Sequence, residues 1–344
     1  MKWKRPAAFF VCAAMVLGLT ACASSNTGSK YDYMIAMITD TGGVNDQSFN
    51  QSAWEGLKQL HADTGIKVNY IESKQTSDFV SNLDVLADNG AKFLWAIGFN
   101  TVDAVTQAAA VNPELNYAVV DNAFDDPADN ITGVVFRAQE SSFMVGYIAA
   151  AVSKTGKVGF IGGISLPVIK QFECGYLAGV AYGAKKLNKT VTVSSQYAES
   201  FADAAKGKAI ANKMFSDGCD VIYHAAGNTG QGMIEAAKEA GKWAIGVDRD
   251  QAYLAPDNVL TSALKNVYAG VEKLSESYMA GEKIGGQNVS YGLADGAVGI
   301  PKEHPNYSDD IYNAAIEVGD QISKGTIVPP STEDEYNAFI KALG

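Results

Sequence analysis

The sequence predicts an α/β protein built from parallel sheets with helices on both faces. Short apolar runs alternate along the chain with stretches of helical periodicity. Runs such as VIYHAAG (221–227) and WAIGVD (243–248) are apolar almost throughout, which is typical of strands covered by helices on both sides. The alternation starts again after residue 156, so we expect two similar lobes rather than one long sheet.

The first series of elements occupies the N-terminal part of the chain. We expect strands at 33–39, 66–72, 92–98, 117–121 and 132–136, and helices near 46–61, 76–89, 100–111 and 139–153. In the second series we expect strands at 157–162, 191–197, 221–224 and 243–247, and helices near 168–187, 203–216 and 230–240.

The change from one series to the next locates the crossings between the lobes. Val134–Glu140 is the first expected hinge, and a second crossing is expected near Thr261–Asn266 because another strand and helix follow it. After residue 290 we expect a Gly-rich strand, YGLADGAVGIP, and a helix at 308–324, whose lobe the pattern alone leaves open. The expected division is 32–137 with about 264–290 in the first lobe, and 138–263 with about 291–344 in the second.

The N-terminus has the pattern of a bacterial export signal. Three basic residues precede an apolar run from Ala7 to Leu19, which is shorter than the ~20 residues that span a bilayer. Leu19-Thr20-Ala21-Cys22 resembles the lipobox of bacterial lipoproteins, and a polar stretch follows it. We therefore expect a signal peptide at 1–21, lipid on Cys22, a tether at 22–31, and a location on the outer face of the bacterial cell membrane. The alternative is an ordinary signal peptide with a chance cysteine.

The charge and size of the chain restrict its partners. Residues 1–21 hold three positive charges and no negative ones, so the formal charge of −11 becomes −14 without them. Such a surface disfavours nucleic acid and anionic ligands as bulk partners. A chain of this length exceeds one typical core, which again favours two domains.

Cysteine and histidine give no sign of a metal site or a cofactor. With Cys12 in the signal and Cys22 assigned to lipid, only Cys174 and Cys219 remain, and either a disulfide or two buried thiols would suit them. There is no CxxC and no cysteine–histidine cluster.

Aspartates follow three of the predicted strands. Asp40, Asp121 and Asp248 each stand where a strand ends, and ligands of open parallel sheets bind beyond the carboxyl ends of the strands. For any one of them a helix cap or a turn would explain the residue equally well. Three such residues at three strand ends favour a ligand site.

The loop DTGGVNDQSFN (40–50) has the glycines of a phosphate-binding turn but not its charges. It carries two carboxylates and no cation, and it matches neither GxxxxGK[ST] nor GxGxxG. Carboxylates about 4 Å from a phosphate would repel it by ~4 kcal/mol per charge pair. The loop therefore favours a neutral solute with hydrogen-bond donors.

Two phenylalanines suit a planar solute. Phe49 stands at the start of a predicted helix and Phe201 follows a strand of the second series, so each lobe would contribute one ring. For Phe49, core packing is the alternative. No GxSxG or HExxH signature is present, and the histidines are scattered, with His224 expected in the core. The sequence thus predicts a binding protein rather than an enzyme.

The segment TDTGGVNDQSFNQSAWEG (39–56) strongly resembles the N-terminal signature of the basic membrane protein family of bacterial lipoproteins. The resemblance extends over VVDNAF (119–124), Phe201–Gly207, AAGNTGQG (225–232), IGVDRDQ (245–251) and TSALKN (261–266). Members of that family include purine nucleoside receptors of ABC transporters. The resemblance implies the type I periplasmic-binding-protein fold, with two Rossmann-like lobes joined by a multi-strand hinge and closing on a solute.

The resemblance also implies roles for individual residues. It makes Phe49 and Phe201 a stacking pair, Asp40 and Asp121 acceptors for the base, Asp248 and Lys265 the pair that holds the ribose, and Gly227 a backbone contact. Asn45, Asp46 and Asn228 are second choices.

The predicted function is a lipid-anchored receptor that delivers guanosine, inosine or adenosine to the permease and ATPase subunits of an ABC transporter. No cofactor, metal or nucleic acid is expected. A sugar or flavin receptor, a surface adhesion or signalling lipoprotein and a nucleoside-cleaving enzyme are the alternatives.

Overall fold

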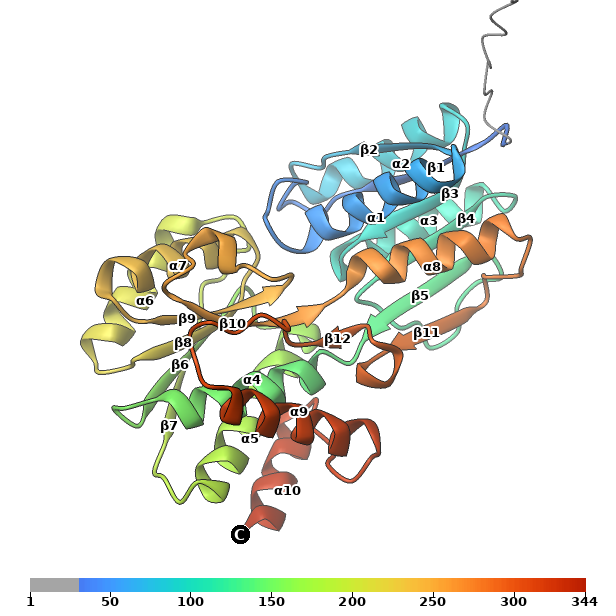
Figure 1. The fold of residues 1–344 in the computed structure, drawn as a ribbon. Helices are drawn as coiled ribbons and strands as arrows, with labels where there is room; N and C mark the ends of the chain where they lie inside the picture. Colours follow the sequence, from blue (N-terminus) through green and yellow to red (C-terminus); the bar gives the residue numbers. More distant parts are fainter. Residues whose placement is uncertain (1–30) are drawn as a thin grey trace, which may run out of the picture.

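The computed structural model describes residues 31–344 and contains two α/β lobes, each built on a six-stranded sheet (Figure 1). The α/β architecture predicted from the sequence is confirmed. The expected signal peptide (1–21), Cys22 and the tether up to residue 30 lie outside the described residues. None of the helices in residues 31–344 is long and apolar enough to cross a membrane.

The sheet of the first lobe is parallel throughout, in the order β11-β5-β4-β3-β1-β2. Its strands are β1 (Met34–Ile38), β2 (Lys67–Ile71), β3 (Ala91–Ile97), β4 (Asn116–Val120), β5 (Ile131–Phe136) and β11 (Gln287–Tyr291). The helices of this lobe are α1 (Phe49–Thr64), α2 (Phe79–Asp88), α3 (Val102–Val111) and α8 (Val267–Met279). In β1, Ile35 and Met37 pack into the core under α1 and α8, while Ala36 and Ile38 pack into the core under α2 and α3. Burial on both faces explains why these strands are apolar runs.

The second sheet has the order β12-β10-β9-β8-β6-β7, and only β12 runs antiparallel to its neighbour. Its strands are β6 (Lys157–Gly162), β7 (Thr192–Tyr197), β8 (Val221–Ala225), β9 (Trp243–Asp248), β10 (Val259–Lys265) and β12 (Val298–Gly299). The helices are α4 (Ala138–Val152), α5 (Pro167–Lys186), α6 (Ala204–Ser216), α7 (Asn228–Ala240), α9 (Asp309–Ser323) and α10 (Glu333–Leu343). Single 3₁₀ turns lie at η1 (Thr76–Asp78), η2 (Phe99–Thr101), η3 (Ala252–Leu254) and η4 (Leu293–Asp295).

The chain passes between the lobes at three places (Figure 1). It leaves the first sheet after β5, returns after β10, and leaves again between β11 and β12. The side chain of Arg137 ties two of these connections together, since it bonds Glu140 at 2.7 Å and Asp295 at 3.2 Å. The connections form the multi-strand hinge.

Three local features differ from the sequence prediction. The segment YGLADGAVGIP is not one strand: β11 ends at Tyr291, η4 closes at Gly296 with φ +68°, and only Val298–Gly299 pair with β10. Helix α10 was not predicted. Helix α1 begins at Phe49 rather than near residue 46, because the Asp46 carboxylate accepts the first backbone N–H groups.

The two remaining cysteines are both free and buried. Burial raises the pKa of Cys174 to about 11. Of the two open alternatives for this pair, the structure has the buried thiols, which pack as small apolar groups.

Helices α4 and α5 of the second lobe pack through glycines. A Cβ on Gly179 would lie 2.1 Å from the carbonyl oxygen of Phe143, and one on Gly175 would lie 2.4 Å from that of Gln139. The close approach fixes the position of α5, whose N-terminal turns line the space between the lobes.

We expect Gly179→Ala to lower the free energy of unfolding by about 1–3 kcal/mol, because backbone atoms of α4 cannot yield to the added methyl group. Urea unfolding measures the loss. Gly299→Ala is the matched control, since its Cβ would meet only a Leu293 methyl group at 3.9 Å. Equal stability of the two variants would contradict this account of the packing.

Candidate ligand-binding cleft

A cleft lies between the lobes, at the carboxyl ends of strands from both sheets. Its empty volume, including the open mouth, is about 580 Å³. Segments far apart in the sequence meet there because both sheets direct their strand ends toward it. The first-choice residues of the sequence analysis all line it, namely Asp40, Phe49, Asp121, Phe201, Gly227, Asp248 and Lys265.

Two of the three second-choice residues line the cleft and one does not. Asp46 and Asn228 line the cleft, whereas Asn45 is exposed and does not. Both oxygens of the Asp46 carboxylate already accept from backbone N–H groups at the start of α1. The side-chain oxygen of Asn228 accepts from Gln231 at 2.7 Å. The Asp46 carboxylate is therefore committed to the start of α1, and the side-chain oxygen of Asn228 to Gln231.

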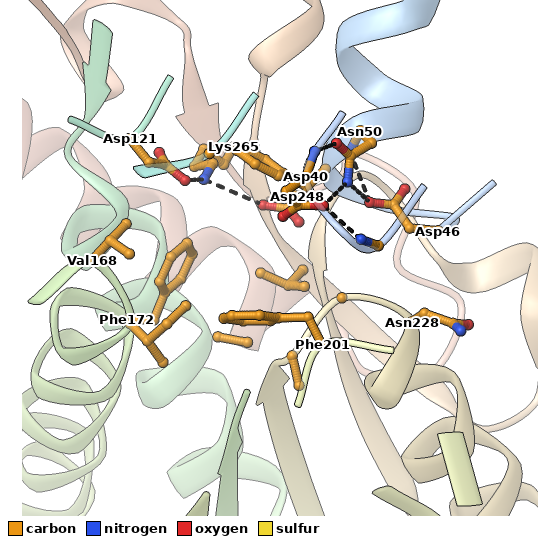
Figure 2. Close-up of a pocket in the computed structure, with 18 of the residues that line it drawn as sticks. Asp40, Asp46, Asn50, Asp121, Val168, Phe172, Phe201, Asn228, Asp248 and Lys265 are labelled. Carbon is orange, nitrogen blue, oxygen red and sulfur yellow. Dashed lines mark hydrogen bonds and ion pairs between the residues drawn. The ribbon is translucent and has the colours of Figure 1, made fainter. Parts of the chain in front are cut away.

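Lys265, the last residue of β10, is the cation of the cleft lining. Its Nζ lies 2.7 Å from Asp121 and 3.8 Å from Asp248, and its side chain is only 3% exposed. The ammonium group also lies 4.4 Å from the centroid of the Phe49 ring. Figure 2 shows Lys265 between the two carboxylates, on the side of the cleft opposite Phe201. The lysine partly neutralises both acids and contacts an aromatic face.

Asp248 ends β9 and turns its carboxylate into the cleft. Its φ of +64° and the φ of +67° at Asp121 are uncommon for residues other than glycine, and such strain concentrates at functional sites. The Ser48 hydroxyl of the first lobe donates to Asp248 of the second. Burial raises the pKa of Asp248 to about 6, even though Lys265 and Ser48 favour its ionised form.

Asp40 follows β1 and is held by its own loop. Its Oδ1 accepts from Asn50 Nδ2 at 2.7 Å and from the Gly42 N–H at 2.8 Å. Burial raises the pKa of Asp40 to about 6, against these two hydrogen bonds. Gly98 has φ +111°, and a Cβ there would come within 3.4 Å of Asp40 Cβ. Gly42 thus orients the Asp40 carboxylate by a hydrogen bond, and Gly98 leaves room for its side chain.

The ring of Phe201 packs against the backbone at Gly163. A Cβ on Gly163 would come within 2.2 Å of the ring, so glycine is required beneath it. The Phe201 carbonyl accepts from the Thr229 N–H at 3.2 Å, which fixes the loop after β7. The phenylalanine therefore presents a supported aromatic face to the cleft.

The part of the lining that comes from α5 was not predicted from the sequence. Val168, Ile169 and Phe172 project from its first turns, and Figure 2 shows Val168 and Phe172 on the same side as Phe201. Their i, i+1, i+4 spacing marks one helix face, but an ordinary buried face has the same spacing. Ser48 and Asn50 were also missed, since their roles depend on contacts that only the folded loops create.

The lining suits a neutral solute. The lining holds four carboxylates (Asp40, Asp46, Asp121 and Asp248) and one lysine, so an added anion would meet net negative charge. The rest is mainly apolar. Within residues 31–344 no group of three or more histidine, cysteine or acidic side chains is arranged to hold a metal ion. Carboxylates can accept from N–H and O–H donors, while the rings bind a flat apolar surface.

Two lobes that enclose a cleft of this kind define the class of solute-binding receptors. The family model for PnrA-like substrate-binding proteins of ABC transporters matches residues 34–332, and this chain belongs to that family. Basic membrane protein A of Borreliella burgdorferi is 38% identical over 331 residues, covering 95% of this chain and 96% of its own. The CD4+ T-cell-stimulating antigen of Listeria monocytogenes is 37% identical, covering 93% and 96%. Substrate-binding proteins of ABC transporters work outside the cytoplasm.

Solved structures agree on the fold. A solute-binding protein of an ABC transporter system from Aeropyrum pernix superposes with a TM-score of 0.81 at 27% identity, covering 90% of this chain and 97% of that one. A solute-binding protein from Conexibacter woesei reaches a TM-score of 0.70 at 20% identity, covering 87% and 99%. The periplasmic-binding-protein fold is thereby confirmed.

We expect Lys265→Met to lower the free energy of unfolding by about 3–5 kcal/mol at pH 8, because it leaves buried carboxylates without their cation. The loss should be smaller at pH 5, since Asp248, with a pKa already raised to about 6, is then mostly protonated and needs no partner. Urea unfolding at both pH values measures the difference. Lys92→Met, on an exposed lysine of β3, is the control. A loss independent of pH would argue against the electrostatic role.

Proposed function

We propose that this protein is a lipid-anchored receptor that binds a purine nucleoside in the cleft and delivers it to the permease of an ABC transporter. The observation that carries the proposal is the pairing of a supported aromatic face, Phe201, with carboxylates and one lysine across the same cleft. Family membership supplies the transporter as partner.

The base would lie between the two lobes. Phe201 and Phe49 line the cleft from different lobes and would contact the faces of the purine. Asp121 and Asp40 would accept from N1–H and, in guanosine, from the 2-amino group. Adenosine has an acceptor at N1 and would need another pose or a protonated acid.

The ribose would lie near Lys265. Asp248 would accept from ribose hydroxyls while Lys265 donates to a hydroxyl oxygen. Because the Lys265 ammonium lies near Asp121 as well as Asp248, it would influence the binding of both the base and the ribose. Closure about the hinge would bury the solute and remove it from water.

The anchor and the absence of catalysis are parts of the same proposal. Lipid on Cys22 would hold the receptor at the outer face of the membrane, close to the permease. The family consists of substrate-binding proteins, and we propose binding without chemistry. Product formation from inosine after long incubation would overturn that part.

Calorimetric titration at tens of micromolar protein tests the ligand class. We expect heat with guanosine or inosine, and none with ribose or riboflavin. Absence of heat with every nucleoside, using protein from which bound solutes were removed by unfolding and refolding, would contradict the proposal.

Phe201→Ala tests the stacking face. Since base–aromatic stacking contributes about 1–3 kcal/mol, the Kd for guanosine should rise by about 5- to 150-fold. The control Phe339→Ala removes a partly buried ring of the same lobe, where α10 packs, and should leave Kd unchanged. An unchanged Kd for Phe201→Ala would favour a sugar ligand.

The affinity for guanosine should fall as the pH is lowered from 8 to 5. Burial raises the pKa of Asp40 and Asp248 to about 6, with Asp46, Asp121 and Lys265 around them. A ligand that donates hydrogen bonds binds the ionised acids, so affinity is full above these pKa values and is lost as pH falls through them. Calorimetry at several pH values, with unfolding curves to verify the fold, measures the change. An affinity that rises on acidification would contradict these roles.

A further inference from the structure

The loop Asp46–Ser48 of the first lobe is hydrogen-bonded to the second lobe by groups that face the loop rather than a solute. Gln231 Nε2 donates to the carbonyl of Asp46 at 3.1 Å, and Gln251 Nε2 donates to the carbonyl of Gln47 at 3.1 Å. The Tyr253 hydroxyl bonds the side chain of Gln47 at 2.6 Å. We call these four residues, Gln47, Gln231, Gln251 and Tyr253, the interlobe clasp.

Gln251 is held in one orientation by its own lobe. The side chain is fully buried, and its Oε1 accepts from the Val247 N–H at 3.0 Å. Its backbone N–H donates to the Ser262 hydroxyl at 3.1 Å. Because the oxygen end of the amide is taken by a backbone donor, the NH₂ end must point to the carbonyl of Gln47. The amide therefore faces the first lobe already oriented to donate.

His224 locks the same amide from the other side. Its Nε2 lies 2.9 Å from Gln251 Oε1, which already accepts from Val247, so the imidazole must be the donor. The other nitrogen, Nδ1, is buried and has no partner within residues 31–344. A Cβ on Gly230 would come within 1.9 Å of Nδ1, so α7 closes over the ring. Burial lowers the pKa of His224 to about 4, which keeps the ring neutral near pH 7.

The loop of the first lobe is equally fixed. Gln47 has φ +57°, an uncommon left-handed conformation that turns its carbonyl outward. The carboxylate of Asp46, the residue before this turn, holds the residues after it through the N–H groups of Ser48 and Asn50. The loop and the Gln251 amide are thus each held by contacts within their own lobe, so little freedom is lost when they bond to each other.

We propose that Gln251, oriented by His224, is a positioning residue that docks the Asp46–Ser48 loop onto the second lobe and so holds the closed state together from outside the solute. Gln47, Gln231 and Gln251 lie in the same motifs as Asp46, Asn228 and Asp248, yet they do not line the cleft. The loop leads directly into Phe49, so docking it also places an aromatic ring of the cleft. The inference rests on the proposed closure around a solute.

Two variants and one control test the clasp. Gln251→Glu keeps the shape and the acceptor for Val247 and His224 but sets a carboxylate oxygen against the carbonyl of Gln47. Tyr253→Phe removes one bond from a residue that is 50% exposed, so it should fold normally. The control Gln196→Glu makes the same glutamine-to-glutamate substitution at an exposed position of β7.

The rate of guanosine dissociation, followed by stopped flow, is the first measurement. We expect Tyr253→Phe to raise it about two- to tenfold and Gln251→Glu more than tenfold, with the association rate unchanged because the solute enters the open form. The second measurement is the radius of gyration of the ligand-free protein by X-ray scattering, which should increase for Gln251→Glu and not for Gln196→Glu.

Scattering separates this inference from the proposed ligand. If guanosine does not bind the parent protein, the nucleoside proposal fails, and an increased radius for Gln251→Glu still supports the clasp. If guanosine binds, unchanged dissociation rates in both folded variants overturn the clasp. If guanosine does not bind, an unchanged radius overturns it.

Discussion

The architecture of the cleft depends on one electrostatic constraint, the burial of several carboxylates beside a single ammonium group. Lys265 lies 2.7 Å from Asp121 and 3.8 Å from Asp248, and all three side chains are less than 10% exposed. Removing charges from water costs several kcal/mol per ion unless partners replace the solvent. The partners come from different elements, since Lys265 ends β10 and Ser48 reaches Asp248 from the other lobe. The two lobes therefore form the site together, and contacts between them supply the bonds that make its charges tolerable.

The remaining features serve this geometry. Left-handed backbone at Asp121 and Asp248 turns strand ends into the cleft, and glycines beneath Asp40 and Phe201 allow close approach. The proposed clasp lies just outside the charged centre and would connect closure to the loop that carries Phe49. A solute with hydrogen-bond donors would replace the hydrogen bonds that water would donate to the acids in an open form. An anion would add to the negative charge instead.

Sequence reasoning found what depends on local pattern. Strand periodicity and the position of Asp40, Asp121 and Asp248 at strand ends were enough to place these residues on one cleft, because parallel sheets bring strand ends together. Phe172 was missed because its orientation depends on how α5 packs against α4. The segment 291–301 was wrongly expected to be one strand, since a turn at Gly296 and the hinge interrupt it. Contacts between lobes, such as Gln251 to Gln47, leave no periodic pattern to detect.

The central claim is that the closed cleft holds a neutral, flat solute rich in hydrogen-bond donors. Mass spectrometry of the compound released by denaturing the purified full-length protein tests it most directly. We expect a purine nucleoside without phosphate, recovered in an amount approaching one per protein molecule and in a smaller amount from a parallel preparation of Phe201→Ala. A phosphorylated compound, or a solute without an aromatic ring, would contradict it.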